Sequence, residues 1–273
     1  MPQIKPEVEA FARIKVIGIG GSGKNAVNHM INSKVKGVEF ISINTDAQDL
    51  HNSLASKKIH IGKNLTRGLG TGMNPELGKR AAEETKEEIQ EALKGADMAF
   101  IAYGAGGGTG SGASPLISKI AKEMGILTVG IVTIPFAFEG NLKIRQALEG
   151  VVSLSEYVDA ILVINNEKLK LIYPDLNLSN AFAKADDVLT NAAKAIAEII
   201  TVPGYINTDF ADVSTIMRDG KVAIMNTGYA SGEDRITKAI EDALNSPLLS
   251  TNDVKGAKKV LLSLYCSTMN EIK

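Results

Sequence analysis

The stretch YGAGGGTGSGASP, residues 103–115, holds six glycines between positions 104 and 112 and follows the apolar run DMAFIA. Glycine permits positive φ angles, so successive backbone N–H groups can point together at an anion. A helix that begins after Pro115 would add the positive end of its dipole. A flexible linker is the alternative, but it does not suit a segment between a buried strand and a helix. The stretch therefore predicts a phosphate-binding loop.

A second glycine-rich stretch, GIGGSGKN at 18–25, follows the apolar run IKVI. It fits part of the P-loop pattern G-x-x-x-x-G-K-[ST], but Asn25 stands where a P-loop has a hydroxyl for Mg²⁺. It also fits the dinucleotide pattern G-x-G-x-x-G, and Asp46 follows 23 positions after Gly23. Each match alone is a weak signal. A nicotinamide-dependent oxidoreductase remains one hypothesis, although it leaves the glycines of 103–115 unexplained.

Composition excludes several classes of protein. The 273 residues are 44% hydrophobic and 22% charged, with 30 Lys and Arg against 31 Asp and Glu and no block of like charge. This balance argues against a nucleic-acid partner, as does an aromatic content of 5% without Trp. A single cysteine, Cys266, excludes a disulfide framework and a multi-cysteine metal site. The longest apolar run, 125–138, is too short to cross a bilayer, so we expect a cytoplasmic protein without membrane insertion.

Short runs rich in Val and Ile alternate with helical segments over the first two-thirds of the chain. The expected strands are 13–19, 37–44, 57–62, 97–104, 127–135 and 159–165. Their nearly continuous apolarity is typical of strands buried on both faces. The segment 74–94 illustrates the helices, with Asn74 as N-cap and Pro75 at the first position. The pattern predicts a doubly wound α/β fold with a mostly parallel sheet.

A long central helix is expected over 179–201, where one apolar stripe runs at helical spacing. Its members are Phe182, Ala185, Leu189, Ala192, Ile196 and Ile199. The helix ends at VPGYIN. Beyond it lie VSTIM at 213–217, KVAIMN at 221–226, a helix around 232–244 and a last strand at 258–266. We therefore expect a nucleotide-binding domain at 1–178, the long helix at 179–203 and a partial α+β C-terminal domain at 204–273.

Taken together, several motifs resemble the FtsZ family of bacterial cell-division proteins, within the tubulin superfamily. They are VIGIGGSGKNAVNHMI, GVEFISINTDAQDL, GLGTGMNPELGKRAAEE, GGGTGSG, IPFAFEG, DDVLTNAAKAIAEIIT, NTDFADVSTIM and GEDRITKAIEDAL. They occur in the family's order over nearly the whole chain. The resemblance implies a tubulin-like GTPase fold that binds GTP and GDP, with Mg²⁺ held mainly through the phosphates. GIGGSGKN is then the first nucleotide loop of such a GTPase.

The resemblance also implies which residues hold the phosphates. They are Gly20, Gly21, Ser22 and Gly23 of the first loop, Asp46 near Mg²⁺, Gly70, Thr71 and Gly72 at the γ-phosphate, and Gly106, Gly107, Gly108, Thr109 and Gly110 of the second loop. Lys24 belongs to the first loop and is counted among the expected binding residues. The Lys24 side chain has no P-loop role in this picture, since relatives commonly have Gly or Asn there. For Asp46, a turn at the end of a strand is the alternative.

At the nucleoside end, the resemblance assigns Glu139 to the ribose and Asn25 to the guanine end. Phe182 is expected to stack on guanine and the pair Asp186–Asp187 to accept its hydrogen bonds, which would select guanine over adenine. Plain core packing is the alternative for Phe182. Lys143 stands where the family usually has Arg, so the planar bidentate contact of a guanidinium is lost.

The stretch NTDFADV, 207–213, clusters an amide and two carboxylates after the long helix. Without context, such aspartates cap or solvate a helix. The resemblance implies that Asp209 and Asp212, with Asn207, orient the attacking water in the pocket of the next subunit. Hydrolysis would then need head-to-tail assembly into a filament.

The partners implied are the chain itself and, in a full-length relative, adaptor proteins of the division ring. The family's C-terminal domain has a four-stranded sheet, of which the sequence contains one full strand. We therefore expect a shortened chain, whether natural or truncated. The leading hypothesis is a filament-forming GTPase at the division site. The alternative is a GTP- or GDP-binding structural module with little polymerisation or turnover.

Overall fold

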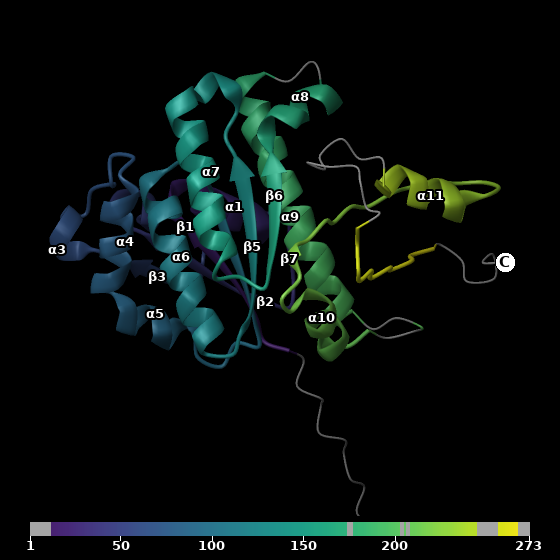
Figure 1. Cartoon of the computed structure of the whole chain (residues 1–273), viewed down its shortest axis with the longest axis horizontal. Helices are drawn as coiled ribbons and strands as arrows, with labels where there is room; N and C mark the ends of the chain where they lie inside the picture. Colours follow the sequence, from purple (N-terminus) through teal and green to yellow (C-terminus); the bar gives the residue numbers. More distant parts are fainter. Residues whose placement is uncertain (1–11, 174–176, 203–204, 206–207, 245–255, 267–273) are drawn as a thin grey trace, which may run out of the picture.

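The computed structural model describes residues 12–173, 177–202, 205, 208–244 and 256–266. Within them seven strands form one sheet in the order β3-β2-β1-β4-β5-β6-β7 (Figure 1), and every neighbouring pair is parallel. The strands are β1 (Ile14–Ile19), β2 (Val38–Asn44), β3 (Lys57–His60), β4 (Met98–Gly104), β5 (Leu127–Ile134), β6 (Ala160–Asn165) and β7 (Lys221–Val222). The predicted α/β fold is confirmed, and the sheet is parallel throughout.

Helices cover both faces of this sheet. They are α1 (Gly20–Asn32), α2 (Ala47–His51), α3 (Lys63–Thr66), α4 (Pro75–Glu84), α5 (Lys86–Leu93), α6 (Gly108–Glu123), α7 (Asn141–Ser155), α8 (Leu169–Ile172), α9 (Leu178–Thr201), α10 (Phe210–Met217) and α11 (Arg235–Leu244), with 3₁₀ turns η1 (Ala137–Glu139) and η2 (Asn166–Lys168). None of the helices in the described part of the chain has the length and apolarity that crossing a membrane requires.

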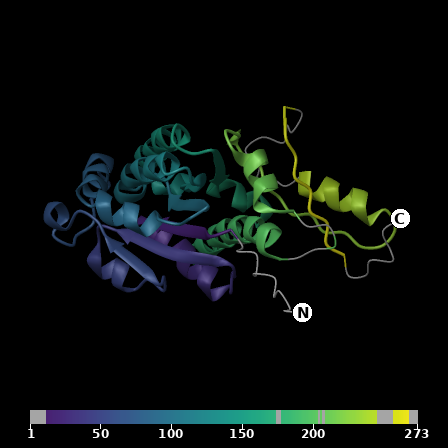
Figure 2. The same ribbon diagram turned by 90° about the horizontal axis from the view of Figure 1, so that it is seen from below.

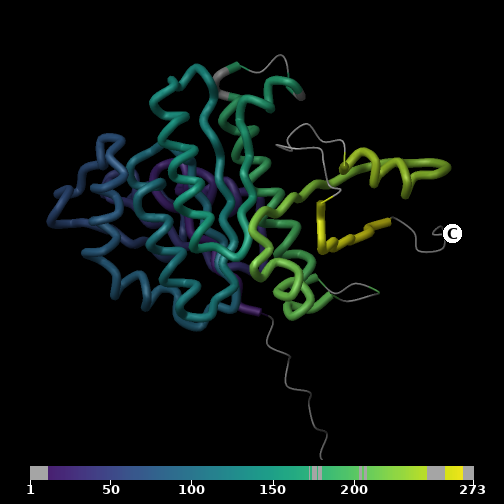
Figure 3. Tube along the Cα trace, viewed as in Figure 1, coloured from purple at the N-terminus to yellow at the C-terminus, as the bar shows by residue number. Residues whose placement is uncertain are grey.

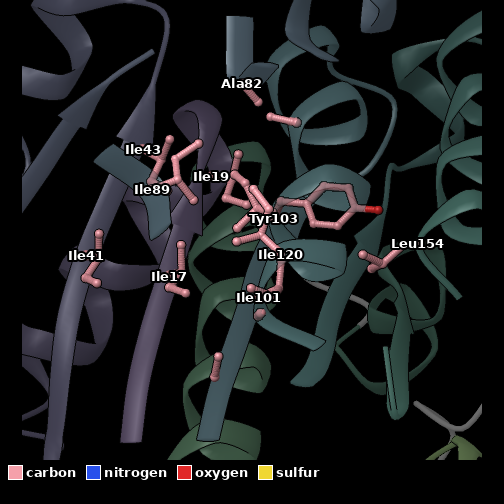
Figure 4. Close-up of a cluster of buried hydrophobic side chains, with 14 of the residues drawn as sticks. Ile17, Ile19, Ile41, Ile43, Ala82, Ile89, Ile101, Tyr103, Ile120 and Leu154 are labelled. Atoms are coloured by element: carbon pink, nitrogen blue, oxygen red, sulfur yellow. The ribbon is translucent and has the colours of Figure 1, made fainter. Parts of the chain in front are cut away.

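Alternate residues of each strand supply the two cores. Ile17 and Ile19 of β1 face one side, where α4, α5, α6 and α7 pack (Figure 4). Ile14 and Val16 of the same strand face the other side, where α1, α9 and α10 pack. All four side chains are at most 2% exposed. Burying a side chain of this size contributes about 1.5–3 kcal/mol, so the central strands are the most strongly held part of the molecule.

The long helix α9 runs along one face of the sheet, against β5 and β6 (Figure 3). Its N-cap Asn177 accepts a hydrogen bond from the backbone N–H of Asn180 at 2.9 Å. Its 24 residues give a length of roughly 36 Å. Ala185, Leu189 and Ile196 of the predicted stripe are buried, whereas Phe182 is 42% exposed. Core packing is therefore not the environment of Phe182.

Two helix predictions were wrong in detail. The expected helix 74–94 is two helices that break at Thr85, whose hydroxyl accepts a bond from the N–H of Gly62 at 3.2 Å. The helix expected after Pro115 begins at Gly108, seven residues before the proline, which lies inside it. Ser114 Oγ donates to the carbonyl of Gly110 at 2.5 Å in this helix. Tertiary packing of the small residues against α4 outweighs the preference of proline for the first turn.

The C-terminal residues also differ from expectation. VSTIM lies in α10, and only Lys221–Val222 of KVAIMN is a strand, which extends the main sheet rather than starting a second one. Residues 258–266 are not a strand and are almost all exposed. An apolar run becomes a strand only when another strand can pair with it, and the described residues provide none here. Figure 2 shows α11 and residues 256–266 to one side of the sheet, and Lys259 Nζ donates to the carbonyl of Thr215 in α10 at 2.6 Å.

Candidate functional site

The strand order reverses between β1 and β4. From β1 the chain adds β2 and β3 on one side, and it then returns to place β4 on the other side. The helices that follow, α1 and α6, pack on opposite faces of the sheet. In open α/β sheets this arrangement leaves a crevice at the carboxyl ends of the strands, where ligands bind. Both glycine-rich stretches lie at this crevice.

The first turns of α1 and α6 have no side-chain caps. Neither N-cap residue, Ile19 or Gly107, accepts a hydrogen bond through its side chain, and neither first turn contains an acid. Gly20 has a φ of +71°, and a Cβ atom there would lie 3.2 Å from the backbone N of Gly110. The two helix starts therefore approach each other through glycine. Their uncapped N–H groups and positive dipole ends make a cradle suited to an anion.

A cavity of about 590 Å³ opens at these helix starts. Fifteen of the twenty expected binding residues line it. They are Gly20, Gly21, Ser22, Asn25, Asp46, Gly70, Thr71, Gly107, Gly108, Thr109, Gly110, Glu139, Lys143, Phe182 and Asp186. They come from segments far apart in the sequence, and the fold brings them to one place.

A chain of hydroxyls joins three loops at the phosphate end. Thr109 Oγ1 lies 2.8 Å from Thr45 Oγ1 and 3.3 Å from Thr71 Oγ1. All three residues are buried. The hydroxyls tie the start of α6 to the loop after β2 and to the loop at 68–72. A shift of one loop would therefore disturb the hydrogen bonds that hold the other two.

The opposite end of the cavity is aromatic and acidic. The ring of Phe182 meets those of Phe136 and Phe138 edge-on. Its centroid lies 5.5 Å from that of Phe136 and 6.4 Å from that of Phe138. Beside it, burial raises the pKa of Asp186 to about 6, while the charge of His29 lowers this pKa and that of Asp187 raises it. An exposed aromatic ring next to a carboxylate suits a flat base that presents N–H donors.

Between the two ends, Glu139 is held from two sides. Its Oε1 accepts from the backbone N–H of Phe136 at 2.8 Å and its Oε2 accepts from Lys143 Nζ at 2.5 Å. Lys143 thus pairs with the acid four positions before it, in place of the bidentate contact of an arginine.

Three expected glycines lie outside the cavity wall. A Cβ atom on Gly23 would lie 2.4 Å from the carbonyl oxygen of Ala102, so this glycine lets α1 pack against β4. A Cβ atom on Gly106 would lie 2.5 Å from the carbonyl oxygen of Lys143. Gly72 has open space around its α-carbon. Gly23 and Gly106 thus make close backbone contacts with segments next to the cavity wall.

Two expected charged residues point elsewhere. Lys24 does not line the cavity, but its Nζ lies 2.6 Å from Oδ1 of Asp49, which does. Asp187 accepts from Lys184 Nζ at 2.8 Å and contacts His29 Nε2 at 2.8 Å. Burial acts to raise the pKa of Asp187, but these two hydrogen bonds outweigh it and lower the pKa. Of the pair Asp186–Asp187, only the first lines the cavity.

The expected catalytic residues lie at the other edge of the sheet. Asn207 is outside the described residues. Asp209 caps α10 by accepting from the N–H of Asp212 at 2.9 Å, and Asp212 accepts in return from the N–H of Asp209 at 3.2 Å. After α10 the chain enters β7, whose Lys221 pairs with Ala160, the first residue of β6. Since β6 and β7 are parallel, α10 lies at the amino edge of the sheet (Figure 1). The cavity lies at the carboxyl edge, where the loops after β1 and β4 line it.

Sequence reasoning missed several residues of the cavity wall. They are Ile19, Asn44, Asp49, Gly104, Ala105, Thr133, Pro135, Asn166 and Ala185. Asn44 ends β2, Thr133 lies near the end of β5 and Asn166 directly follows β6. A polar residue at the carboxyl end of a parallel strand is a signal available from sequence, because these ends share one edge of the sheet.

The donors present fit a nucleotide better than a protein-held metal ion. In the described part of the chain, no three His, Cys, Asp or Glu side chains are grouped so that they could hold a metal. The phosphate end offers backbone N–H groups, hydroxyls and the carboxylates of Asp46 and Asp49. Mg²⁺ usually binds through one or two carboxylates together with substrate phosphates, and this donor set allows that arrangement.

Two family models match the sequence. The Tubulin/FtsZ family, GTPase domain, matches residues 13–174. The FtsZ family, C-terminal domain, matches residues 221–271. Together they cover most of the chain on both sides of α9.

Individual proteins are similar over most of this chain. The cell division protein FtsZ of Porphyromonas gingivalis is 53% identical over 93% of this chain, and that of Pseudomonas aeruginosa is 51% identical over 97%. The chain spans only 56% of the first protein and 67% of the second. Among solved structures, an empty FtsZ dimer of M. jannaschii has a TM-score of 0.84 at 46% identity, covering 89% of this chain and 71% of its own. CetZ2 of Haloferax volcanii shares the fold, with a TM-score of 0.68 at 24% identity over 81% of this chain and 67% of its own.

Proposed function

The chain belongs to the tubulin/FtsZ family, and from this we propose that it binds GTP and hydrolyses it when it assembles head-to-tail. The product would be a cytoskeletal filament of the bacterial division ring. The observation that carries the proposal is the cavity at the switch point, which joins an anion cradle to a base-binding end. Family membership leaves the oxidoreductase hypothesis without support.

The phosphate end supports a polyphosphate ligand. The first turns of α1 and α6 offer uncapped N–H groups, and the hydroxyls of Thr71 and Thr109 lie beside them. Glycine at Gly20, Gly21 and Gly108 lets the ligand approach the backbone closely. We assign Mg²⁺ mainly to the phosphates, and Asp46 is the carboxylate that we place beside it.

The base end supports guanine. An ionised carboxylate at Asp186 accepts hydrogen bonds but donates none, which matches the N1–H and 2-amino groups of guanine and not the edge of adenine. Phe182 offers an exposed ring for stacking, and Asn25 also lines the cavity. We assign Glu139 and Lys143 to the ribose between the two ends.

The distance between the cavity and α10 supports a shared active site. Helix α9 is roughly 36 Å long, with Asp186 at the cavity and Thr201 towards the other edge. Asp209 and Asp212 therefore cannot act on a nucleotide in their own cavity. If one subunit stacks on the next, these carboxylates and Asn207 enter the neighbour's cavity and orient the attacking water. Phosphoryl transfer needs mainly such positioning, and a head-to-tail contact that does not close makes a filament.

The relatives' names support the cellular role. The matched P. gingivalis and P. aeruginosa proteins are cell division proteins, so we place this chain at the division site in the cytoplasm. We assign adaptor proteins as partners of the full-length protein, and neither nucleic acid nor membrane insertion is part of the proposal. The division into 1–178, 179–203 and 204–273 is likewise proposed as the domain organisation.

A second candidate is a guanine-nucleotide-binding module with little turnover. The observation in its favour is that residues 256–266 are almost all exposed and pair with no strand among the described residues. If the C-terminal surface needed for assembly is incomplete, the cavity would still bind GTP and GDP, but no neighbour would deliver the carboxylates.

The test is GTP turnover per subunit against protein concentration, with pelleting at each concentration. The proposed function predicts that turnover rises with the pelleted fraction. Asp212→Asn keeps a side-chain acceptor for the cap of α10 and removes the charge, and it should lower turnover by about 100-fold while GTP still binds. Asp219→Asn is the matched control on the same edge, since Asp219 is exposed and contacts Lys122 at 3.6 Å.

The outcomes separate the candidates. Binding of GTP without pelleting or turnover supports the module. A high and constant turnover at nanomolar protein contradicts the shared site, because isolated subunits lack the neighbour's carboxylates.

A further inference from the structure

Lys24 and Asp49 form a partly buried ion pair beside the first turn of α1, in which Lys24 is the more buried partner. Lys24 is 9% exposed and its Nζ lies 2.6 Å from Asp49 Oδ1. The second oxygen, Asp49 Oδ2, accepts from Asn44 Nδ2 at 2.8 Å. Both carboxylate oxygens therefore have partners, and the pair connects α1 to α2.

The carboxylate of this pair faces the proposed phosphate site. Asp49 lines the cavity together with Asp46. Its Oδ2 lies 3.5 Å from the position that a Cβ atom on Gly21 would occupy. A polyphosphate that approaches the backbone of Gly21 would thus meet two negative side chains, of which only one is needed to hold Mg²⁺. Repulsion between like charges at such short range is large when little water lies between them.

We infer that Lys24 is a positioning residue that cancels the charge of Asp49 and so makes the phosphate end compatible with a nucleoside di- or triphosphate. This inference rests on the proposed function. The pair also holds α2 in place, and the backbone N–H of Asp49 donates to Asp46 Oδ1 at 2.9 Å. Lys24 thereby orients the carboxylate of Asp46 without touching the ligand.

A purely structural ion pair makes a different prediction. Loss of such a pair would destabilise the chain and weaken the binding of every guanine ligand alike. Loss of charge cancellation would instead act in proportion to the phosphate charge. It would weaken GTP most, GDP less and guanosine not at all.

The experiment is calorimetric titration of nucleotide-free protein with GTP, GDP and guanosine. For Lys24→Met we expect GTP affinity to fall about 10-fold, as one uncancelled charge at this range implies, with a smaller fall for GDP and none for guanosine. Asp49→Asn should bind GTP at least as tightly as the parent chain. The double variant Lys24→Met/Asp49→Asn should recover parental GTP affinity, since no uncompensated charge remains.

Lys15→Met is the matched control. Lys15 is 8% exposed and its Nζ lies 3.1 Å from Glu39 Oε2, but it stands at the amino end of β1, away from the cavity. It should lower thermal stability without changing the ratio of GTP to guanosine affinity. Position 49 carries no negative charge in the double variant or in Asp49→Asn. These two variants therefore report on the inference even if Lys24→Met folds poorly.

Two results would overturn the inference. One is an equal loss of affinity for all three ligands in Lys24→Met, and the other is a double variant that binds GTP no better than Lys24→Met. If the parent chain binds neither GTP nor GDP, the proposed function itself fails and the inference fails with it.

Discussion

The hydroxyl of Thr109 is the meeting point of three loops, because it contacts those of Thr45 and Thr71. Thr45 is fully buried, so its hydroxyl has no access to water if this partner is lost. At the scale of single residues, the site therefore depends on polar groups that satisfy one another as well as the ligand. Asp186 also depends on its surroundings, since burial raises the pKa of its carboxyl group.

Thr109→Val should destabilise the chain and weaken GTP binding. Valine has the shape of threonine but leaves Thr45 Oγ1 buried without this partner, which costs about 1–3 kcal/mol. Thermal unfolding and GTP titration are the measurements. Thr190→Val is the control, because Thr190 Oγ1 is buried and finds no hydrogen-bond partner among the described residues. If both variants behave alike, the hydroxyl chain does not contribute to the site.

GTP affinity should fall as the pH drops below about 6. Burial raises the pKa of Asp186 to about 6, and only the ionised carboxylate accepts both hydrogen bonds from guanine. Titration with GTP at about pH 5 and pH 7 measures the effect, and Asp186→Asn should bind weakly at both values. An unchanged affinity between the two values would rule out Asp186 as the guanine acceptor.

In the ligand-free chain, the contribution of Asp186 to the free energy of unfolding should change with pH in the opposite direction to GTP affinity. The raised pKa means that the folded chain binds this proton more tightly than the unfolded chain does. The contribution of Asp186 to the free energy of unfolding is therefore larger at low pH and decreases as the pH rises from about 4 to 6. Comparing the parent chain with Asp186→Asn in denaturant melts isolates this contribution.

At the scale of elements, close approach of α4 and α6 shapes the phosphate end. A Cβ atom on Gly112 would lie 1.9 Å from the carbonyl oxygen of Pro75, and one on Gly78 would lie 2.4 Å from that of Gly108. The two helices can touch only because glycine stands at these points. Since α4 directly follows the loop at 68–72 and α6 begins the cradle, this contact sets the position of one relative to the other.

Gly112→Ala should push these two helices apart. Because backbone and not a flexible side chain blocks the added methyl group, we expect a loss of about 1–3 kcal/mol in the free energy of unfolding and weaker GTP binding. Chemical denaturation and nucleotide titration are the measurements. Gly256→Ala, where nothing lies within 4 Å of the new atom, should change neither quantity. Equal stability of Gly112→Ala and the parent chain would contradict the close contact.

At the scale of the whole molecule, the sheet separates the two halves of the proposed active site. Asp186 lies with the cavity at the carboxyl edge, and Asp212 lies at the amino edge beyond the far end of α9. A single subunit therefore presents the proposed nucleotide cavity at one end and the two carboxylates at the other. This polarity is what a head-to-tail contact requires.

Mixing two inactive variants should restore turnover. Asp186→Asn impairs the cavity and Asp212→Asn impairs the opposite end, so each alone should hydrolyse GTP slowly. In an equal mixture roughly a quarter of the head-to-tail contacts join an intact cavity to an intact carboxylate pair, and turnover should recover in proportion. A mixture no more active than its components, despite pelleting, would contradict catalysis between subunits.

The local features of this chain were open to prediction from its sequence. Six of the seven strands, the N-cap at Asn74 and the long helix α9 follow from apolar periodicity and capping residues, because the backbone preferences of a segment reside in that segment. The position of the two glycine-rich stretches after β1 and β4 follows for the same reason. With the family's motifs, these features predicted twenty binding residues, of which fifteen line the cavity.

Only the tertiary structure settled which way individual side chains point and which apolar runs find partners. Lys24 turns to Asp49, and Asp187 turns to His29, because those neighbours come from other segments of the chain. Pro115 stays inside α6 because α4 packs against the small residues around it. Residues 258–266 have the composition of a strand but no strand beside them in the described structure. In each case the free energy depends on contacts between segments, which no single stretch of sequence contains.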